Sequence, residues 1–329
     1  MKCFSNALCA VTALAATCTY AACANAQDVP IAYPSKPVRI IIPLGPGNSV
    51  EIVTRLIAEK LSSAFGQQFV IEAQPGASGQ IGAERVAKSS ADGYTLLAAN
   101  DGIMTMLPNL QKNVRYAPMR DFAPITQMVG IPFALIVHPS IPANTAAELI
   151  QLAKRQPGKL EFSSGGNGSA QHLAMELFMR QTGTTFVHIP YKGAPQAAMD
   201  VVAGQIPVAF AGVPIVASLI KQRRLRALGV ASPKRLALIG ETPTLGEQGI
   251  ALTFEAWAGL FAPSGTPAEI IQKLNHEAVK ALKLRDVQTR IADFGFENYG
   301  TSAGRFAETL RADYTRMAEV IKLAGVKLE

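Results

Sequence analysis

The sequence predicts an α/β protein of two lobes, and three observations support this fold class. Segments rich in Val, Ile and Leu alternate with segments whose apolar residues recur at helical spacing. Turns rich in Gly, Pro, Ser and Asn separate them. The 329 residues are 49% hydrophobic and 17% charged, which supplies a large core and excludes a disordered chain. The alternation predicts parallel sheets covered by helices.

The first 26 residues have the pattern of an export signal peptide. Lys2 gives a positive start, Ala7 to Ala24 is uncharged and mostly apolar, and Ala24-Asn25-Ala26 fits cleavage after Ala26. The alternatives are a membrane anchor and lipid attachment through Cys23. The apolar run is rich in Ala and Thr, and Tyr20 stands where lipid attachment requires a small aliphatic residue. We therefore expect the signal to be removed and the protein to be periplasmic.

The positions of the cysteines and histidines argue against metal and thiol chemistry. All four cysteines lie within residues 1–26, so the mature chain has no disulfide and no thiol nucleophile. The four histidines lack the spacing of metal ligands. No later segment approaches about 20 uninterrupted apolar residues, which predicts a soluble mature protein.

The mature chain begins with a βαβαβ pattern and continues with a second series of alternating strands and helices. We expect strands followed by Gly-rich turns, with helices after most of these turns and two long helices near the end. The last two helices open at Thr266-Pro267 and at Thr301 or Ser302. The predicted strands cover 38–43, 68–72, 94–98, 133–137, 160–163, 185–189, 208–210 and 225–230. The predicted helices cover 52–66, 145–156, 195–204, 267–284 and 302–323, with a short helix after Gly79 and another that carries Leu173, Leu177 and Phe178 on one face.

Two crossings between lobes are expected, near Met128–Phe133 and Thr253–Gly259. The first lobe then comprises residues 27–130 with 254–329, and the second comprises residues 131–253. The formal charge of +7 is spread along the chain, and its densest basic run, residues 221–226, is short. Such a run is more typical of a solvated surface than of a nucleic-acid interface.

Enzymatic signatures are missing from the expected strand-to-helix turns. Neither glycine-rich loop ends in Gly-Lys-Ser/Thr, and the first turn lacks a dinucleotide fingerprint. Residues 47–51 match a nucleophile elbow only up to the fifth position, where Glu51 replaces the required Gly. We therefore expect a non-enzymatic protein with no cofactor and no catalytic residues.

The same turns are better suited to hold an anion. They lie at the carboxyl ends of parallel strands, where α/β proteins bind ligands. Glycine lets the backbone approach a ligand, and the following helix offers free N–H groups. Ser49 and Ser169 both stand where a helix N-cap is expected. Two helix N-termini that face one cleft would hold a small carboxylate.

A series of motifs in one order resembles a known family across residues 30–329. The chain is similar to the Bug-type solute-binding proteins, which are the extracytoplasmic receptors of tripartite tricarboxylate transporters. The motifs are Tyr33 to Arg39, Pro43 to Gly47, Pro75 to Gly79, Ala91 to Leu97, Ser163 to Leu173, Pro190 to Gly193, Thr242 to Thr244, Trp257 to Leu260 and Ala262 to Pro267.

The resemblance implies a periplasmic-binding-protein fold of type II, with two crossing strands and two lobes that close like a flytrap. It implies a small organic acid as the ligand and a membrane permease as the partner, and we expect a monomer. The ligand-binding residues that it implies are Leu44, Gly45, Gly47, Asn48, Ser49, Asn100, Gly102, Ser164, Gly165, Asn167, Gly168, Ser169, His172, Tyr191 and Gly212.

Two departures from the family pattern bear on the ligand. Asn48 replaces a Gly of the first loop, and Ala211-Gly212 stands where relatives often carry Asp-Asn. Loss of that Asp removes an acceptor for an amino group, which favours an aliphatic or aromatic dicarboxylate over an amino acid. A sensor for a signalling partner and a receptor for a non-acid molecule remain alternatives.

Several side chains near the expected cleft have two interpretations. His172 is expected either to donate to a ligand carboxylate or to cap its own helix, and Tyr191 either to contact the ligand or to pack in the wall. Lys192 is expected more often to be solvated than to bind. Trp257 is expected more often to pack or support the hinge than to contact the ligand. Asp101 beside an anion would be repulsive unless it binds water or turns away.

Overall fold

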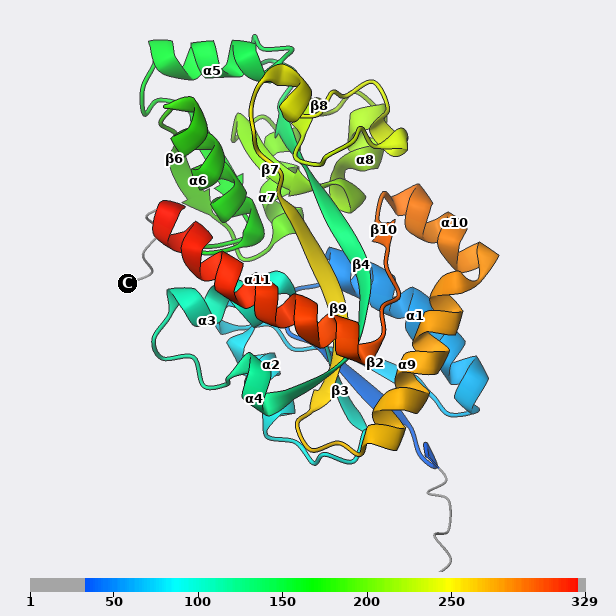
Figure 1. Cartoon of the computed structure of the whole chain (residues 1–329). Coiled ribbons are helices and arrows are strands. Elements are labelled where there is room, and N and C mark those ends of the chain that lie inside the picture. The colour runs from blue at the N-terminus through cyan, green and yellow to red at the C-terminus, as the bar shows by residue number, and fades with distance from the viewer. Residues whose placement is uncertain (1–32, 325–329) are drawn as a thin grey trace, which may run out of the picture. The chain divides into compact units, whose positions relative to one another are not determined.

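The computed structural model describes residues 33–324, and the predicted signal peptide lies outside these residues. The fold described below is that of the compact unit that begins at Lys36 (Figure 1). None of the helices within residues 33–324 combines the length and apolar composition needed to span a bilayer.

Ten strands of the described chain belong to one continuous sheet. Its order is β2-β1-β3-β9-β4-β7-β5-β6, and β8 and β10 also pair with β4. The strands are β1 (Val38–Ile42), β2 (Phe69–Ala73), β3 (Thr95–Asn100), β4 (Phe122–Val137), β5 (Glu161–Ser164), β6 (Val187–Pro190), β7 (Val208–Gly212), β8 (Arg226–Val230), β9 (Glu255–Pro263) and β10 (Glu297–Asn298).

The helices flank this sheet, and most follow a strand directly. The α-helices are α1 (Ser49–Phe65), α2 (Gln80–Ala87), α3 (Leu107–Leu110), α4 (Pro118–Asp121), α5 (Ala146–Arg155), α6 (Ala170–Thr182), α7 (Ala194–Val202), α8 (Val213–Lys221), α9 (Ala268–Lys283), α10 (Arg285–Phe294) and α11 (Ala303–Ala324). Shorter helical turns are η1 (Ala77–Gly79), η2 (Gly102–Met106), η3 (Ala237–Ile239) and η4 (Gly246–Gln248).

Parallel pairing places the ends of several strands at common edges. β1 is parallel to β2 and to β3, and β5 is parallel to β6 and to β7. Neighbouring parallel strands must be joined by crossover connections, and the helices between these strands supply them. The loops that follow β1, β2 and β3 therefore emerge at one edge, and those that follow β5, β6 and β7 emerge at another.

The 16-residue strand β4 belongs to both groups of parallel strands. Residues 122–132 pair with β9, whereas residues 133–137 pair with β7. We call β1, β2, β3, β9, β10 and residues 122–132 of β4 sheet A, and β5, β6, β7, β8 and residues 133–137 sheet B. The change of partner falls between Pro132 and Phe133, inside the predicted crossing. β4 and β9 run through the middle of Figure 1.

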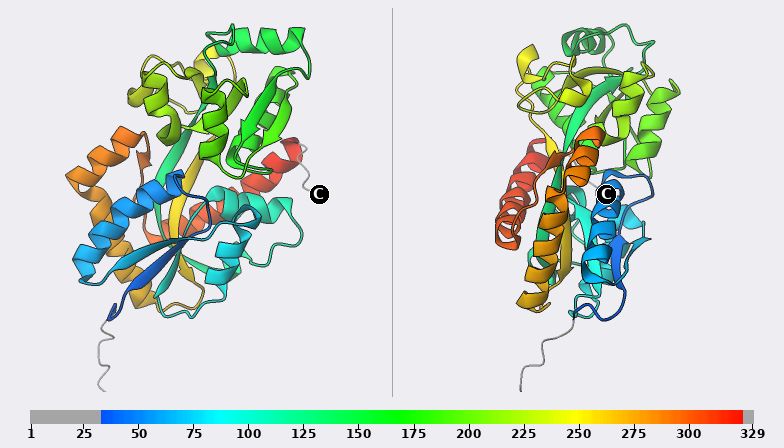
Figure 2. Two further views of the ribbon diagram at one scale, coloured as in Figure 1. Left: turned by 180° about the vertical axis from the view of Figure 1, so that it is seen from behind. Right: turned by 90° about the vertical axis from the view of Figure 1, so that its right-hand side faces the viewer.

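Helix α11 packs against one face of the crossing strands, the face toward the viewer in Figure 1. It contacts β4, η2 and α6 (Figure 1). The side view in Figure 2 shows α11 and α1 on opposite sides of these strands. Trp257 of β9 lies under α11, where its ring meets Phe306 edge-on and its Nε1 donates to Asp313 at 2.7 Å. Trp257 is 3% exposed, which agrees with its predicted supporting role.

Four features of this fold were not predicted from the sequence. Residues 122–132 of β4 were not predicted, because Pro124, Gly130 and Pro132 interrupt its apolar run. Helix α8 was missed because Pro214 reads as a break, although it occupies the first turn, where proline is tolerated. Helix α10 and strand β10 were also not separated from the loops around them.

Candidate ligand-binding site

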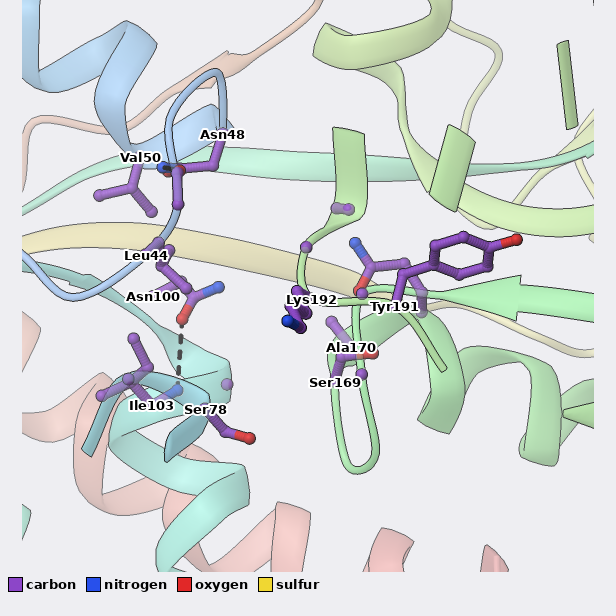
Figure 3. Close-up of a pocket in the computed structure, with 18 of the residues that line it drawn as sticks. Leu44, Asn48, Val50, Ser78, Asn100, Ile103, Ser169, Ala170, Tyr191 and Lys192 are labelled. Carbon is purple, nitrogen blue, oxygen red and sulfur yellow. Dashed lines mark hydrogen bonds between the residues drawn. The ribbon is translucent and has the colours of Figure 1, made fainter. Parts of the chain in front are cut away.

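A cavity of about 1010 Å³ lies where the loops after the parallel strands of sheets A and B meet. Pockets for drug-sized ligands occupy roughly 300–1,000 Å³, so this cavity has room for a small molecule with a bulky body. Figure 3 shows Leu44, Asn48 and Asn100 on one side and Ser169, Ala170 and Tyr191 on the other.

Most of the predicted site residues line this cavity, whereas Gly47, Ser164 and His172 do not. Those that line it are Leu44, Gly45, Asn48, Ser49, Asn100, Gly102, Gly165, Asn167, Gly168, Ser169, Tyr191 and Gly212.

The loop after β1 is held by Asn48, which caps helix α1. Its side-chain oxygen accepts the Glu51 N–H at 3.0 Å, and its side-chain nitrogen donates to the Gly45 carbonyl at 2.5 Å. Glu51 in turn accepts the Gly47 N–H at 2.8 Å. These reciprocal bonds resemble a capping box. The prediction of Ser49 as the N-cap is therefore wrong, because the side chain of Asn48, one residue earlier, accepts the unpaired N–H of the first helical turn.

Because Asn48 is the cap, Ser49 is the first residue of α1. Its hydroxyl makes no hydrogen bond to the described residues, although Ser49 is only 8% exposed. The first N–H groups of a helix have no partner within it. The N–H groups of Ser49 and Val50 are in this position, and both residues line the cavity.

The loop after β5 presents a second helix N-terminus. Ser169 caps α6 as predicted, and its hydroxyl accepts the His172 N–H at 3.4 Å. Ala170 and Gln171, the first two residues of α6, line the cavity. This arrangement leaves their N–H groups available to a ligand.

His172 stabilises the loop after β5 by a hydrogen bond to its backbone. Its Nδ1 accepts the Gly168 N–H at 3.0 Å, and its Nε2 lies 3.4 Å from Glu176. Both ring nitrogens thus have protein partners, which matches the predicted capping alternative rather than donation to a ligand. Ser164 is similarly occupied by the backbone of Gly166 and by His188.

His188 completes a stack of rings beneath the loop. Its ring stacks on His172 at 3.9 Å and on Phe162 at 4.7 Å. Burial, together with the neighbouring His172, lowers the pKa of His188 to about 4. The His188 ring is therefore neutral near pH 7.

The end of β3 contributes Asn100 and Gly102, while Asp101 between them turns away. The Asn100 side-chain oxygen accepts the Ile103 N–H at 3.2 Å, and Figure 3 shows its amide nitrogen on the side of Lys192. Asp101 is 2% exposed, and its Oδ1 has no partner among the described residues. Burial and the nearby Asp313 raise the pKa of Asp101 to about 8. Its carboxyl is therefore mostly neutral at pH 7.

Tyr191 uses its hydroxyl within the protein. The hydroxyl donates to Asp200 at 2.5 Å, and this bond raises the pKa of Tyr191 to about 12. The ring also packs against the core of sheet B. Tyr191 is thus a wall residue whose polar atom is already engaged.

The two sides of the cavity approach closely at glycines. A Cβ placed on Gly212 would lie 3.3 Å from Ile131 Cγ2 and 3.7 Å from the Ser49 hydroxyl. A Cβ on Gly47 would lie 3.9 Å from Pro195. The preceding Ala211 packs in the core of sheet B rather than lining the cavity.

A third wall, the loop after β2, was missed as part of the site. Its residues Gly76 to Gly79 all have positive φ, including Ala77 at 46° and Ser78 at 55°. Such strain in non-glycine residues is often found at functional sites. The signal was present, because Pro75-Gly76-Ala77-Ser78-Gly79 is another glycine-rich turn between a strand and a helix.

The rest of the missed lining is mainly apolar. Large aliphatic and aromatic side chains cover the inner wall, which suits the carbon skeleton of an organic ligand. These residues are Val50, Ile103, Leu107, Ile131, Phe133 and Ile215.

The electrostatics of the cavity favour an anion. Five α-helices begin at its wall, namely α1, α2, α6, α7 and α8, and each N-terminus carries a partial positive charge. Among the described residues that line it, Lys192 has the only charged side chain. Within residues 33–324, no group of three or more His, Cys, Asp or Glu residues could hold a metal ion.

Comparison with known proteins identifies the class of this fold and site as solute-binding receptors. The chain belongs to the tripartite tricarboxylate transporter receptor family, whose model matches residues 53–326. This membership confirms the predicted resemblance and the α/β periplasmic-binding-protein fold. Because the family and the structural relatives are receptors, the prediction that the chain is not an enzyme is also supported.

Three relatives illustrate the match. Protein BugT of Bordetella pertussis is 31% identical over 90% of this chain and 92% of its own length. The structure of R. palustris Rpa4515 with adipate is 31% identical, covers 90% of this chain and 99% of that chain, and has a TM-score of 0.87. MatC from Rhodopseudomonas palustris with bound malate is 27% identical, covers 88% of this chain and all of that chain (100%), and has a TM-score of 0.83.

Proposed function

We propose that this receptor captures a small organic carboxylate, preferably an aliphatic or aromatic dicarboxylate, and delivers it to a membrane permease. Residues 27–130 with 254–329 form one lobe in this proposal, and residues 131–253 form the other. The ligand lies between them in the cavity described above.

The convergence of helix N-termini on a cavity without acidic side chains carries this proposal. The N–H groups of Ser49 and Val50 on one side, and of Ala170 and Gln171 on the other, are placed to bind carboxylate oxygens. The hydroxyl of Ser49 and the amide of Asn100 add neutral donors. The apolar wall would cover the carbon skeleton.

The absence of a carboxylate from the described lining disfavours an amino-acid ligand. An ammonium group buried there would face helix N-termini and Lys192 without a negative partner. The relatives seen with adipate and malate hold dicarboxylates, which agrees with this choice for the present chain.

Membership of the family supports export and a transport role. The predicted signal peptide, residues 1–26, would place the mature protein in the periplasm, where we expect it to act as a monomer. A ligand drives closure only through its differential affinity for the closed state. The closed form is then the one that a permease would recognise.

A thermal-shift screen of the purified protein against small acids tests the proposal. A ligand that binds only the folded state at 100 times its Kd stabilises it by about 2.7 kcal/mol, which moves the Tm visibly. We expect shifts with dicarboxylates and none with aspartate or glutamate. Shifts with amino acids alone, or with none of the acids, would contradict it.

A further inference from the structure

Lys192 has an unusual position among the basic residues of this protein. It lines the cavity, it is the only charged side chain among the described lining residues, and it is exposed there. No hydrogen bond or salt bridge within residues 33–324 engages its ammonium group. The hydroxyl of the adjacent Tyr191 donates to Asp200.

The backbone around Lys192 is fixed on both sides. The Tyr191 N–H donates to the Ser164 carbonyl at 3.0 Å, which continues the pairing of β5 with β6. Gly193 caps α7, and the Ala197 N–H donates to its carbonyl at 3.2 Å. Lys192 is thus a flexible side chain on a fixed segment, and Figure 3 shows it between Asn100 and Ser169.

From these observations we infer that Lys192 binds the second carboxylate of a doubly charged ligand and so determines the preference for diacids over monoacids. This inference rests on the proposed function. The first carboxylate would bind the N–H groups of Ser49 and Val50, and the carbon skeleton would pass the apolar wall of Ile103 and Phe133.

The charge balance of the closed cavity explains the selectivity. Enclosing an ammonium group without a negative partner is unfavourable, since it loses water and gains no ion pair. A diacid supplies that partner, whereas a monoacid of the same length does not. A surface ion pair would contribute little, but in an enclosed site of low dielectric the pair is much stronger.

Titration calorimetry on Lys192→Met tests the inference. The probes are succinate, adipate and benzene-1,4-dicarboxylate, each compared with its monomethyl ester, which has the same skeleton and one charge fewer. We expect the variant to bind the best diacid at least about tenfold more weakly. Its affinity for the matching ester should change by less than about threefold, because the ester never engages the ammonium.

Two further variants keep the result interpretable. Lys192→Arg retains the charge and should restore most of the diacid affinity. Lys221→Met removes an exposed lysine at the end of α8, outside the cavity lining, and should change neither affinity.

The possible outcomes separate this inference from the proposed function. Suppose that the wild-type protein binds diacids, and that Lys192→Met either weakens the binding of diacid and ester equally or changes the binding of neither. The inference is then wrong and the proposed function stands. If the wild-type protein binds esters as tightly as diacids, the inference is also wrong. If it binds no acid, both fail.

Discussion

Asp101 is the residue whose environment most changes its chemistry. Its neighbours Asn100 and Gly102 line the cavity, yet its own carboxyl is buried, with Asp313 and the backbone N–H of Trp257 nearby. A charged carboxylate so close to an anion site would repel the ligand. The burial that raises its pKa to about 8 keeps the group neutral over most of the physiological range.

This raised pKa predicts a dependence of stability on pH. Below about pH 4 both the folded and the unfolded chain carry a protonated Asp101. Between about pH 4 and pH 8 the unfolded chain loses this proton while the folded chain keeps it, so the contribution to stability falls as pH rises. Above pH 8 it stays constant. Urea denaturation across this range should show the slope in the wild type.

Asp101→Asn provides the control for this effect. The variant has nearly the same shape and no proton to lose, so its free energy of unfolding should fall less between pH 4 and pH 8. We also expect the wild type to bind diacids more weakly above pH 8 than the variant. Parallel pH profiles for both proteins would rule out the buried neutral carboxyl.

Asn48 determines the form of the first binding loop. Asn48→Ala removes the bonds to the Glu51 N–H and the Gly45 carbonyl, and loss of an N-cap costs about 1 kcal/mol of stability. Asn48→Ser retains a capping oxygen and should recover most of it. Urea denaturation measures both, and equal stability of the two variants would show that the cap does not matter.

At the scale of elements, the loop that opens α6 is built on backbone conformation. Gly168 has φ +72°, and its N–H donates to His172. Gly168→Pro forces a negative φ and removes that N–H. We expect ligand affinity to fall at least about tenfold while the circular dichroism spectrum stays that of a folded protein.

Gly158→Pro is the matched control for the loop. Gly158 has φ +67°, its N–H donates to the Thr185 carbonyl, and it lies outside the cavity lining. The two variants suffer the same kind of backbone damage, so only Gly168→Pro should lose affinity. Equal losses in both would attribute the effect to general destabilisation.

The packing of β9 against α11 depends on a glycine. A Cβ on Gly259 would lie 2.2 Å from Phe306 Cζ, in the middle of an aromatic cluster that includes Trp257 and Phe261. Gly259→Ala should therefore destabilise the protein by about 1–3 kcal/mol, as overpacking does. Urea denaturation of the variant and of the wild type measures this difference in the free energy of unfolding.

Substitution of Gly304, on helix α11 itself, is expected to have the opposite effect. A Cβ there meets nothing within 4 Å, and its φ is not positive. Gly304→Ala should leave stability unchanged or raise it by up to about 1 kcal/mol. Equal effects of the two substitutions would contradict the close packing of β9 with α11.

The predictable part of the fold was the part with local signals. The strands β1, β2, β3 and β5 and the long helices α9 and α11 have clear periodicity and agree with the structure within a few residues. The long strand β4 was recognised only at residues 133–137. Its first part contains Pro124, Gly130 and Pro132 and forms a strand because it pairs with β9. Tertiary pairing of this kind leaves no local signature.

At the scale of the whole molecule, the sequence identified two of the loops that form the site, but not how all the loops and side chains are arranged around the cavity. The turns after β1 and β5 were identified by their Gly, Ser and Asn residues, and they do meet at one cavity. The turn after β2 carries the same signal, but its place beside β1 follows only from sheet order. His172 and Tyr191 face protein partners, since side-chain direction depends on packing that the sequence does not specify.

A crystal structure of the protein with its best-binding diacid is the most direct test of the central claim. We expect one carboxylate within hydrogen-bond distance of the N–H groups that open α1 or α6, with the carbon skeleton of the ligand against the apolar wall. A ligand bound elsewhere, or a carboxylate in contact with neither helix N-terminus, would contradict it.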